Sequence, residues 1–139
     1  MFYNCYGLTE LDLSSFNTSN VTNMMGMFAY CHAIEKLDVS KFNTAKVENM
    51  QQMFNDCKTL SVLNVSNFDT SKVTDMLGMF NQCMALTSLD VSNFETSSVT
   101  STYGMFQHCD NLTSSATLFI LPTCSLMESI LIGLIPGPQ

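Results

Sequence analysis

The sequence predicts an α/β fold: a solenoid of 26-residue turns, each with one short parallel strand, a second extended segment and a short helical turn. Two observations carry this prediction. The motif M-F-x-x-C recurs so that successive cysteines, such as Cys5 and Cys31, are always 26 residues apart. The pattern L-x-x-L-x-[LV] follows the first four of these cysteines in a fixed register. A constant period of this length is typical of stacked repeats. The five copies of the motif start at Met1, Met27, Met53, Met79 and Met105.

Length and composition restrict the classes of function. A chain of 139 residues is expected to form one domain, and 46% hydrophobic with only 12% charged residues argues against disorder. The formal net charge is −7, with five lysines and no arginine, which argues against nucleic-acid binding. The six cysteines include no closely spaced pair, which argues against a zinc site.

Each repeat is predicted to begin with a strand. Leu11 and Leu13 are two residues apart, so their side chains point to one face of an extended segment and the residue between them points to the other. We expect these segments to stack as a parallel sheet with a spacing of about 4.8 Å. The outward-pointing column consists of Asp12, Asp38, Asn64 and Asp90.

A corner follows each predicted strand. Phe16 stands two residues after Ser14 and is followed by Asn17 and Thr18, and the later repeats keep this order with small changes. Asn and Asp at such positions favour local turns in which the side chain bonds to the backbone. We therefore predict that the phenylalanine fills the core where the chain reverses.

The second half of each repeat allows two arrangements. Val21, Met24, Phe28 and Cys31 are spaced as on one face of a short amphipathic helix. Alternatively, the residues from Val21 to Met24 are extended and only 24–31 is helical. The β-branched pair Val21-Thr22 favours the second arrangement.

The repeated methionines and cysteines are predicted to fill the core. Met is a flexible side chain that fits irregular gaps, and free Cys is among the most buried residue types. Stacked turns would bring Cys31 and Cys57 within about 5 Å, which permits a disulfide. One column of buried thiols accounts for all five repeat cysteines without bonding, so free thiols are favoured.

Catalytic chemistry finds no support in the sequence. His32 and His108 occupy non-equivalent positions beside the repeat cysteines and are predicted to be surface residues. No glycine-rich phosphate loop, H-E-x-x-H or G-x-S-x-G motif occurs. The sequence therefore predicts no enzyme activity, no catalytic residues, no metal site and no cofactor.

Two regions are predicted: a repeat domain over 1–113 and an apolar, non-repeat tail over 114–139. Leu112 keeps the first leucine of the pattern, but Ser115 stands where the next is expected. The tail has no uninterrupted apolar run of the roughly 18 residues that a membrane span needs. The sequence opens inside a repeat without a secretory leader, which predicts an internal piece, or a mis-started one, of a longer protein.

The stretch L-T-E-L-D-L-S-S-F-N-T-S-N-V-T-N-M-M-G-M-F-A-Y-C, from Leu8 to Cys31, resembles the repeat of BspA-like leucine-rich-repeat surface proteins, a group also seen among mycoplasma-type surface lipoproteins. The resemblance covers residues 1 to about 113. It implies a right-handed solenoid of the leucine-rich-repeat type, a cell-surface or extracellular location, and adhesion to host or matrix proteins. It supplies no catalytic residues.

Solenoids commonly bind proteins through the extended face that their strands present. We therefore predict protein binding at the positions that flank the strands, because neighbouring turns present them side by side. A structural spacer, with activity elsewhere in a longer protein, is the alternative, and self-association through uncapped ends is a further expectation. The candidate binding residues are Glu10, Asp12, Glu35, Lys36, Asp38, Val62, Asn64, Ser88 and Asp90.

Overall fold

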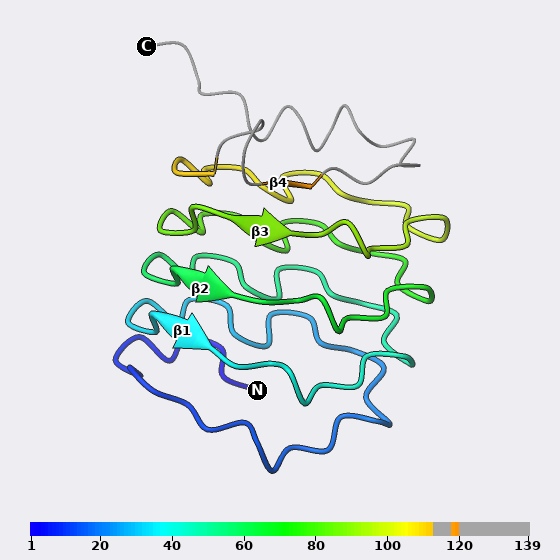
Figure 1. The fold of residues 1–139 in the computed structure, drawn as a ribbon, viewed down its shortest axis with the longest axis horizontal. Coiled ribbons are helices and arrows are strands. Elements are labelled where there is room, and N and C mark those ends of the chain that lie inside the picture. The colour runs from blue at the N-terminus through cyan, green and yellow to red at the C-terminus, as the bar shows by residue number, and fades with distance from the viewer. Residues whose placement is uncertain (113–117, 120–139) are drawn as a thin grey trace.

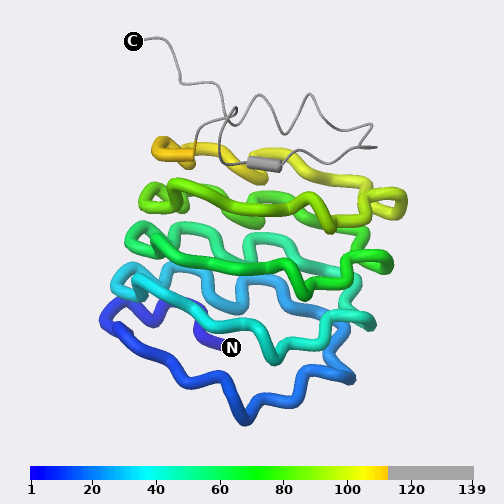
Figure 2. The backbone as a smooth tube through the Cα atoms, in the orientation of Figure 1, coloured from blue at the N-terminus to red at the C-terminus, as the bar shows by residue number. Residues whose placement is uncertain are grey.

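The chain winds into a coil of turns stacked one above the other, as the computed structural model shows for residues 1–112 and 118–119 (Figure 1). The backbone tube shows successive turns running side by side, with the N-terminus at one end of the stack (Figure 2). Regular strands are short. They are β1 (Lys36–Leu37), β2 (Val62–Leu63), β3 (Leu89–Asp90) and β4 (Leu118–Phe119).

The strand side of the coil is not one continuous sheet. β1 pairs in parallel with β2, with Leu37 opposite Leu63, and β3 pairs in parallel with β4, with Leu89 opposite Leu118. β2 and β3 belong to separate sheets. The expectation of a strand in every repeat and of an uninterrupted parallel sheet is therefore wrong at this junction and in the first turn, where residues 11–13 form no strand.

A change of one residue type accompanies the interruption. The Thr59 hydroxyl donates to the carbonyls of His32 and Ile34, at 2.7 and 3.0 Å, and so ties its turn to the preceding one. The equivalent position in the next repeat is Ala85, which has no hydroxyl to donate. The turns that carry β2 and β3 lack this tie.

A second parallel ladder runs along the opposite side of the coil. Asn23, Asn49, Asp75 and Ser101 form consecutive parallel bridges at the positions of the expected second extended segment. The Met24 amide donates to the Asn49 carbonyl at 2.9 Å, and the later repeats repeat this bond. One short extended contact thus connects each turn of the coil to the next, and we also call a turn a rung of the stack.

The segment expected to be helical forms a series of tight turns instead, and no helix occurs in the described part of the chain. The amides of Met27 and Cys31 close local bonds to the carbonyls three residues before them. Gly26 and Tyr30 have φ values of 62° and 63°, and a left-handed residue at the third position is the mark of a type II turn. Phe28, between them, donates its amide to Met53 of the next turn, so the helical bonding pattern is not continued.

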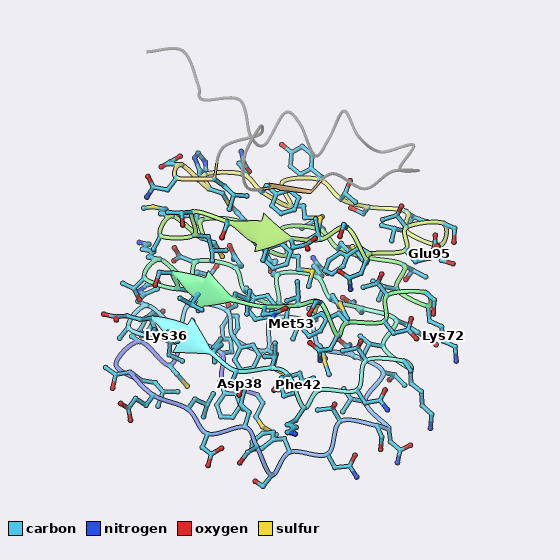
Figure 3. All side chains as sticks on the ribbon, viewed as in Figure 1. Lys36, Asp38, Phe42, Met53, Lys72 and Glu95 are labelled. Carbon is cyan, nitrogen blue, oxygen red and sulfur yellow. The ribbon has the colours of Figure 1, made fainter. Side chains whose placement is uncertain are left out.

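Identical side chains stack through the interior. Phe28, Phe54 and Phe80 are fully buried, and their rings stack at centroid distances of 5.6 and 5.5 Å. From the second turn on, the repeat methionines such as Met53 fill the adjoining space, and the corner phenylalanines such as Phe42 are also buried (Figure 3). Each rung therefore supplies one layer of a continuous core, as expected for stacked repeats.

Buried threonines connect the corners. The Thr44 hydroxyl donates to the Asp69 carbonyl at 3.0 Å and accepts a bond from the Asp69 amide at 2.8 Å. Thr18 and Thr70 make the same reciprocal pair with the next turn, to Asn43 and Glu95 respectively. A buried hydroxyl thus satisfies one backbone donor and one backbone acceptor, which is why a small polar residue stands there.

The predicted tail, 114–139, lies outside the described residues apart from β4. β4 pairs with β3 at a separation of 29 residues, as in Leu89 opposite Leu118, whereas β1 and β2 pair at the repeat distance of 26. The register on the strand side therefore shifts by three residues at the C-terminal end.

Candidate functional site

The nine candidate residues lie on the strand side of the coil, and all nine are exposed. Lys36 and Val62 are direct partners in the β1–β2 pair, so neighbouring turns bring their side chains together. Val62 keeps 53% of its surface exposed although it is apolar. Figure 3 shows Lys36 and Asp38 on the near side of one rung. These positions form rows across neighbouring turns, and we call the nine residues together the strand-side face.

The aspartates of the strand-side face have a local structural task that the sequence analysis did not assign. The carboxylates of Asp12, Asp38 and Asp90 each accept the amide of the serine two residues later, at 2.9 to 3.0 Å. Asn64 makes the same bond to the Ser66 amide through its side-chain oxygen. These are side-chain-capped turns of the kind Asp and Asn favour.

The same bonds fix the charge of the face. Hydrogen bonds from the side chain and backbone of the following serine hold the pKa of Asp12, Asp38 and Asp90 below the ordinary value. The three carboxylates are therefore ionised at neutral pH. Glu10 and Glu35 add to the acidic character of this side, and Lys36 is the one cation among the nine candidates.

A groove opens in the strand-side face where β2 and β3 are not paired. Its volume is about 440 Å³, and it is mixed in polarity, with the leucines and valine beneath it buried. Three predicted residues, Asn64, Ser88 and Asp90, lie along it. The groove is lined by Leu63, Asn64, Val65, Ser66, Ser88, Leu89 and Asp90.

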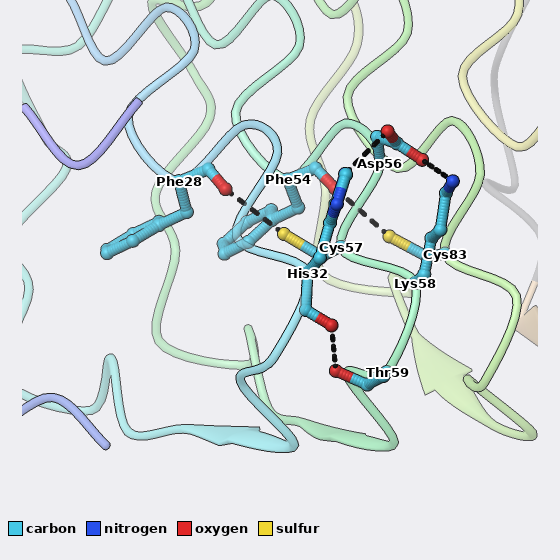
Figure 4. Close-up of polar contacts among 8 residues, drawn as sticks. All are labelled: Phe28, His32, Phe54, Asp56, Cys57, Lys58, Thr59 and Cys83. Atoms are coloured by element: carbon cyan, nitrogen blue, oxygen red, sulfur yellow. Dashed lines mark hydrogen bonds and ion pairs between the residues drawn. The ribbon is translucent and has the colours of Figure 1, made fainter. Parts of the chain in front are cut away.

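The buried repeat cysteines are unsuited to nucleophilic chemistry. The five described cysteines are free, and the thiols of Cys57 and Cys83 donate to the carbonyls of Phe28 and Phe54, at 3.1 and 3.2 Å (Figure 4). Burial raises the pKa of Cys57 and of Cys109 to about 12. A thiol is reactive as the thiolate, so these groups are inert at neutral pH.

A cluster that the sequence analysis did not predict lies between the second and third turns. His32 Nε2 is 2.8 Å from Asp56 Oδ2, and Lys58 Nζ is 3.7 Å from Asp56 Oδ1 (Figure 4). The Tyr6 ring packs on His32 at a centroid distance of 4.8 Å. Five residues directly precede a repeat cysteine, and Asp56 is the one acidic residue among them. This departure from the repeat is the sequence feature that could have indicated the cluster.

The His32–Asp56 pair resembles part of a catalytic arrangement, but the neighbouring thiol does not complete it. Cys57 directs its thiol to the Phe28 carbonyl and not to the imidazole. The pair links two successive turns, since His32 and Asp56 are 24 residues apart. Its geometry supports a structural tie between rungs.

The described residues contain no group of three or more His, Cys, Asp or Glu side chains arranged to hold a metal ion. No helix within the described ranges is long and apolar enough to cross a membrane. The strand-side face offers five carboxylates, one amide, one hydroxyl and the ammonium group of Lys36, beside the exposed Val62.

Two stretches of the chain, residues 1–63 and 38–133, match a family described as "Mycoplasma protein of unknown function, DUF285". The second match continues past residue 113, where the repeat pattern in the sequence ends. No curated protein matches the chain. No solved structure matches it either.

Proposed function

The chain belongs to the DUF285 family of Mycoplasma proteins of unknown function. We propose that it is a non-enzymatic cell-surface repeat protein that binds other proteins through its strand-side face. Within this proposal the fold is a right-handed, leucine-rich-repeat-type solenoid of the BspA-like group. Its partners are host or matrix proteins.

One observation carries the proposal: every one of the nine candidate positions is exposed, and Lys36 and Val62 are direct partners on neighbouring turns. Repeat proteins bind through such extended surfaces because each turn adds one row of side chains to the same face. The groove beside Asn64, Ser88 and Asp90 interrupts these rows and gives a partner a recess to enter.

Charge and apolar contact point to the kind of partner surface. Three ionised aspartates favour a partner with lysine or arginine side chains opposite them. Val62 supplies a central apolar contact at 53% exposure. Binding of this type combines a small apolar contact with a polar surround, as is usual in protein interfaces.

The alternative proposal is a structural spacer, and one observation favours it. The aspartate side chains cap local turns, so folding alone accounts for Asp38 and Asp90 without a partner. Under this alternative the repeat array separates other parts of a longer protein or assembly, and the strand-side face binds no partner.

The double variant Asp38→Asn, Asp90→Asn separates the two proposals. Asn64 occupies the same column and caps its turn through an amide oxygen, so asparagine preserves the cap while it removes the charge. Binding of the purified chain to immobilised collagen and fibronectin is measured by surface plasmon resonance. Protein binding at this face predicts at least a tenfold loss of affinity with an unchanged circular dichroism spectrum.

Glu95→Gln provides a matched control, because Glu95 is an exposed carboxylate that caps a corner turn outside the nine candidate positions (Figure 3). Its affinity should equal that of the unsubstituted chain. Absence of binding by the unsubstituted chain, or equal affinity of the double variant, would support the spacer.

A further inference from the structure

The groove between β2 and β3 is held in place by hydrogen bonds on both sides of it. Before the groove, the Asp56 amide donates to the Asn81 carbonyl of the next turn at 2.7 Å. After it, the Asn93 side-chain amide donates to the carbonyls of Ser66 and Phe68, at 3.1 and 3.0 Å. The two turns are therefore joined at both ends of the groove, so the folded backbone itself sets its width.

Backbone pairing is missing along the groove itself. In the turn before, the Ser61 amide donates to the Glu35 carbonyl at 2.9 Å beside the β1–β2 pair. The equivalent bond one turn later would join the Thr87 amide to the Ser61 carbonyl, and in the described part of the chain this bond is absent. Backbone groups that a fold leaves unpaired bond to water or to a ligand.

The lining of the groove has polar atoms that the fold does not use. Asp90 Oδ1 accepts the amide and the hydroxyl of Ser92, at 2.9 and 2.6 Å, whereas no hydrogen bond among residues 1–112 and 118–119 occupies Oδ2. The hydroxyls of Ser66 and Ser88 likewise have no partner within these described ranges. The lining thus offers one carboxylate oxygen and two hydroxyls as acceptors.

The groove carries a single negative charge beside an apolar part. Asp90 is the one charged residue of the lining, and hydrogen bonds from Ser92 hold the pKa of its carboxyl below the ordinary value. Leu63 and Leu89 supply the apolar part. The volume of about 440 Å³ lies within the range of about 300–1,000 Å³ that is usual for ligand pockets. This combination favours a cationic group on an apolar stem.

We propose that the groove is a subsite for an arginine side chain of the partner protein, which rests on the proposed function and names one contact within it. An arginine guanidinium has five N–H donors in one plane, so it bonds to a carboxylate and still has donors for neighbouring hydroxyls. Its methylene stem contacts apolar side chains while its charge stays at the polar rim. A lysine ammonium lacks the planar arrangement and binds as a point charge.

Titration of the isotopically labelled chain with the peptide acetyl-Gly-Arg-Gly-amide, followed by nuclear magnetic resonance, tests this subsite. We expect the largest changes in the backbone amide signals at residues 63–66 and 88–90, and we expect them to saturate. Citrulline in place of arginine keeps the shape of the side chain without its charge, and lysine keeps the charge without the planar group. Both of these peptides should bind about tenfold more weakly, because each lacks the charged, planar pairing with a carboxylate.

Asp90→Asn tests the carboxylate directly, because Asn64 shows that asparagine keeps the turn cap in this column. The substitution should weaken binding of the arginine peptide about tenfold, as expected for one lost hydrogen bond to a charged group. Asp69→Asn is the matched control, because Asp69 accepts the amide and hydroxyl of Ser71, at 3.0 and 2.6 Å, but lies at a corner outside the groove. Its affinity for the peptide should be unchanged, and both variants should keep the circular dichroism spectrum of the unsubstituted chain.

Three outcomes would overturn the proposal: no signal changes at the groove, equal binding of the arginine peptide and either comparison peptide, or equal effects of the two substitutions. These results are separable from those for the proposed function. Signal changes at the groove without binding of collagen or fibronectin would refute the proposed partners and support the subsite. Loss of collagen or fibronectin binding in the double variant, without signal changes at the groove, would refute the subsite and support the proposed function.

Discussion

Replacing Thr44 by valine should destabilise the fold by breaking one rung-to-rung connection while the shape of the side chain is kept. Thr44 is 1% exposed, and its hydroxyl makes two bonds to the backbone of Asp69, one as donor at 3.0 Å and one as acceptor at 2.8 Å. Valine is β-branched like threonine, so it fills nearly the same space and adopts a similar rotamer.

The expected cost follows from the two lost bonds. A typical intramolecular hydrogen bond contributes about 1 kcal/mol net, and a buried group left without a partner costs about 1–3 kcal/mol. Part of the Asp69 backbone can recover a bond to water, because Asp69 itself is exposed. We therefore expect Thr44→Val to lower the free energy of unfolding by about 2 kcal/mol.

Urea unfolding followed by circular dichroism gives this free energy, provided that the slope with denaturant is the same for both proteins. Thr74→Val is the matched control. The Thr74 hydroxyl donates to the Glu48 carbonyl at 3.2 Å but is exposed, so water replaces the lost bond and the cost should stay below about 0.5 kcal/mol. A cost below about 0.5 kcal/mol for Thr44→Val, or equal costs at both sites, would refute the role assigned to the buried threonine column.

Three further predictions concern turns and thiols. Gly78→Ala should cost about 1–2 kcal/mol in urea unfolding, because Gly78 has φ +60° and an added Cβ would lie 3.3 Å from Gln52 Cγ; Gly7→Ala, with open space around it, should be neutral. At pH 8 a disulfide-exchange reagent should leave Cys57 and Cys109 unmodified in the folded chain and modify both after unfolding; rapid modification before unfolding would contradict their burial. Burial raises the pKa of Cys57 to about 12, whereas the thiol in the unfolded chain ionises near pH 9. The stability that this thiol contributes is therefore present below pH 9 and is lost as the pH rises towards 12. Cys57→Ser should reduce this loss of stability at alkaline pH, as measured by thermal unfolding.

The sequence alone identified which side chains belong together. A period of 26 without insertions means that residues one period apart occupy equivalent places on successive turns, so the repeat itself predicts that the columns of Phe, Met, Cys and Leu form the core. Phe54, Met53 and Cys57 are all fully buried in the structure. The exposed positions beside the strands could be named in the same way, from the alternation of one leucine with one polar residue.

Bonding within a turn was harder to predict. The spacing of Val21, Met24, Phe28 and Cys31 fits a helix, but left-handed residues at Gly26 and Tyr30 produce separate tight turns. Glycine adopts a left-handed conformation readily, so the residue type predicts this conformation at Gly26. Tyrosine does not favour it, so the residue type does not predict it at Tyr30. The backbone of this segment donates hydrogen bonds to the next turn of the coil. Its conformation therefore depends on contacts between turns and not on the residues of one turn alone.

What only the tertiary structure decided is how two neighbouring rungs differ. The separation of β2 from β3, the groove beside Asp90 and the His32–Asp56 tie each depend on a pair of residues about one period apart in the chain. A repeat pattern contains the features that all turns of the coil share. For this protein it therefore predicts which side chains form the core. The surface of the protein depends on single residues that differ between one repeat and the next. The effect of such a difference is decided by the contacts between the two neighbouring turns, which only the tertiary structure provides.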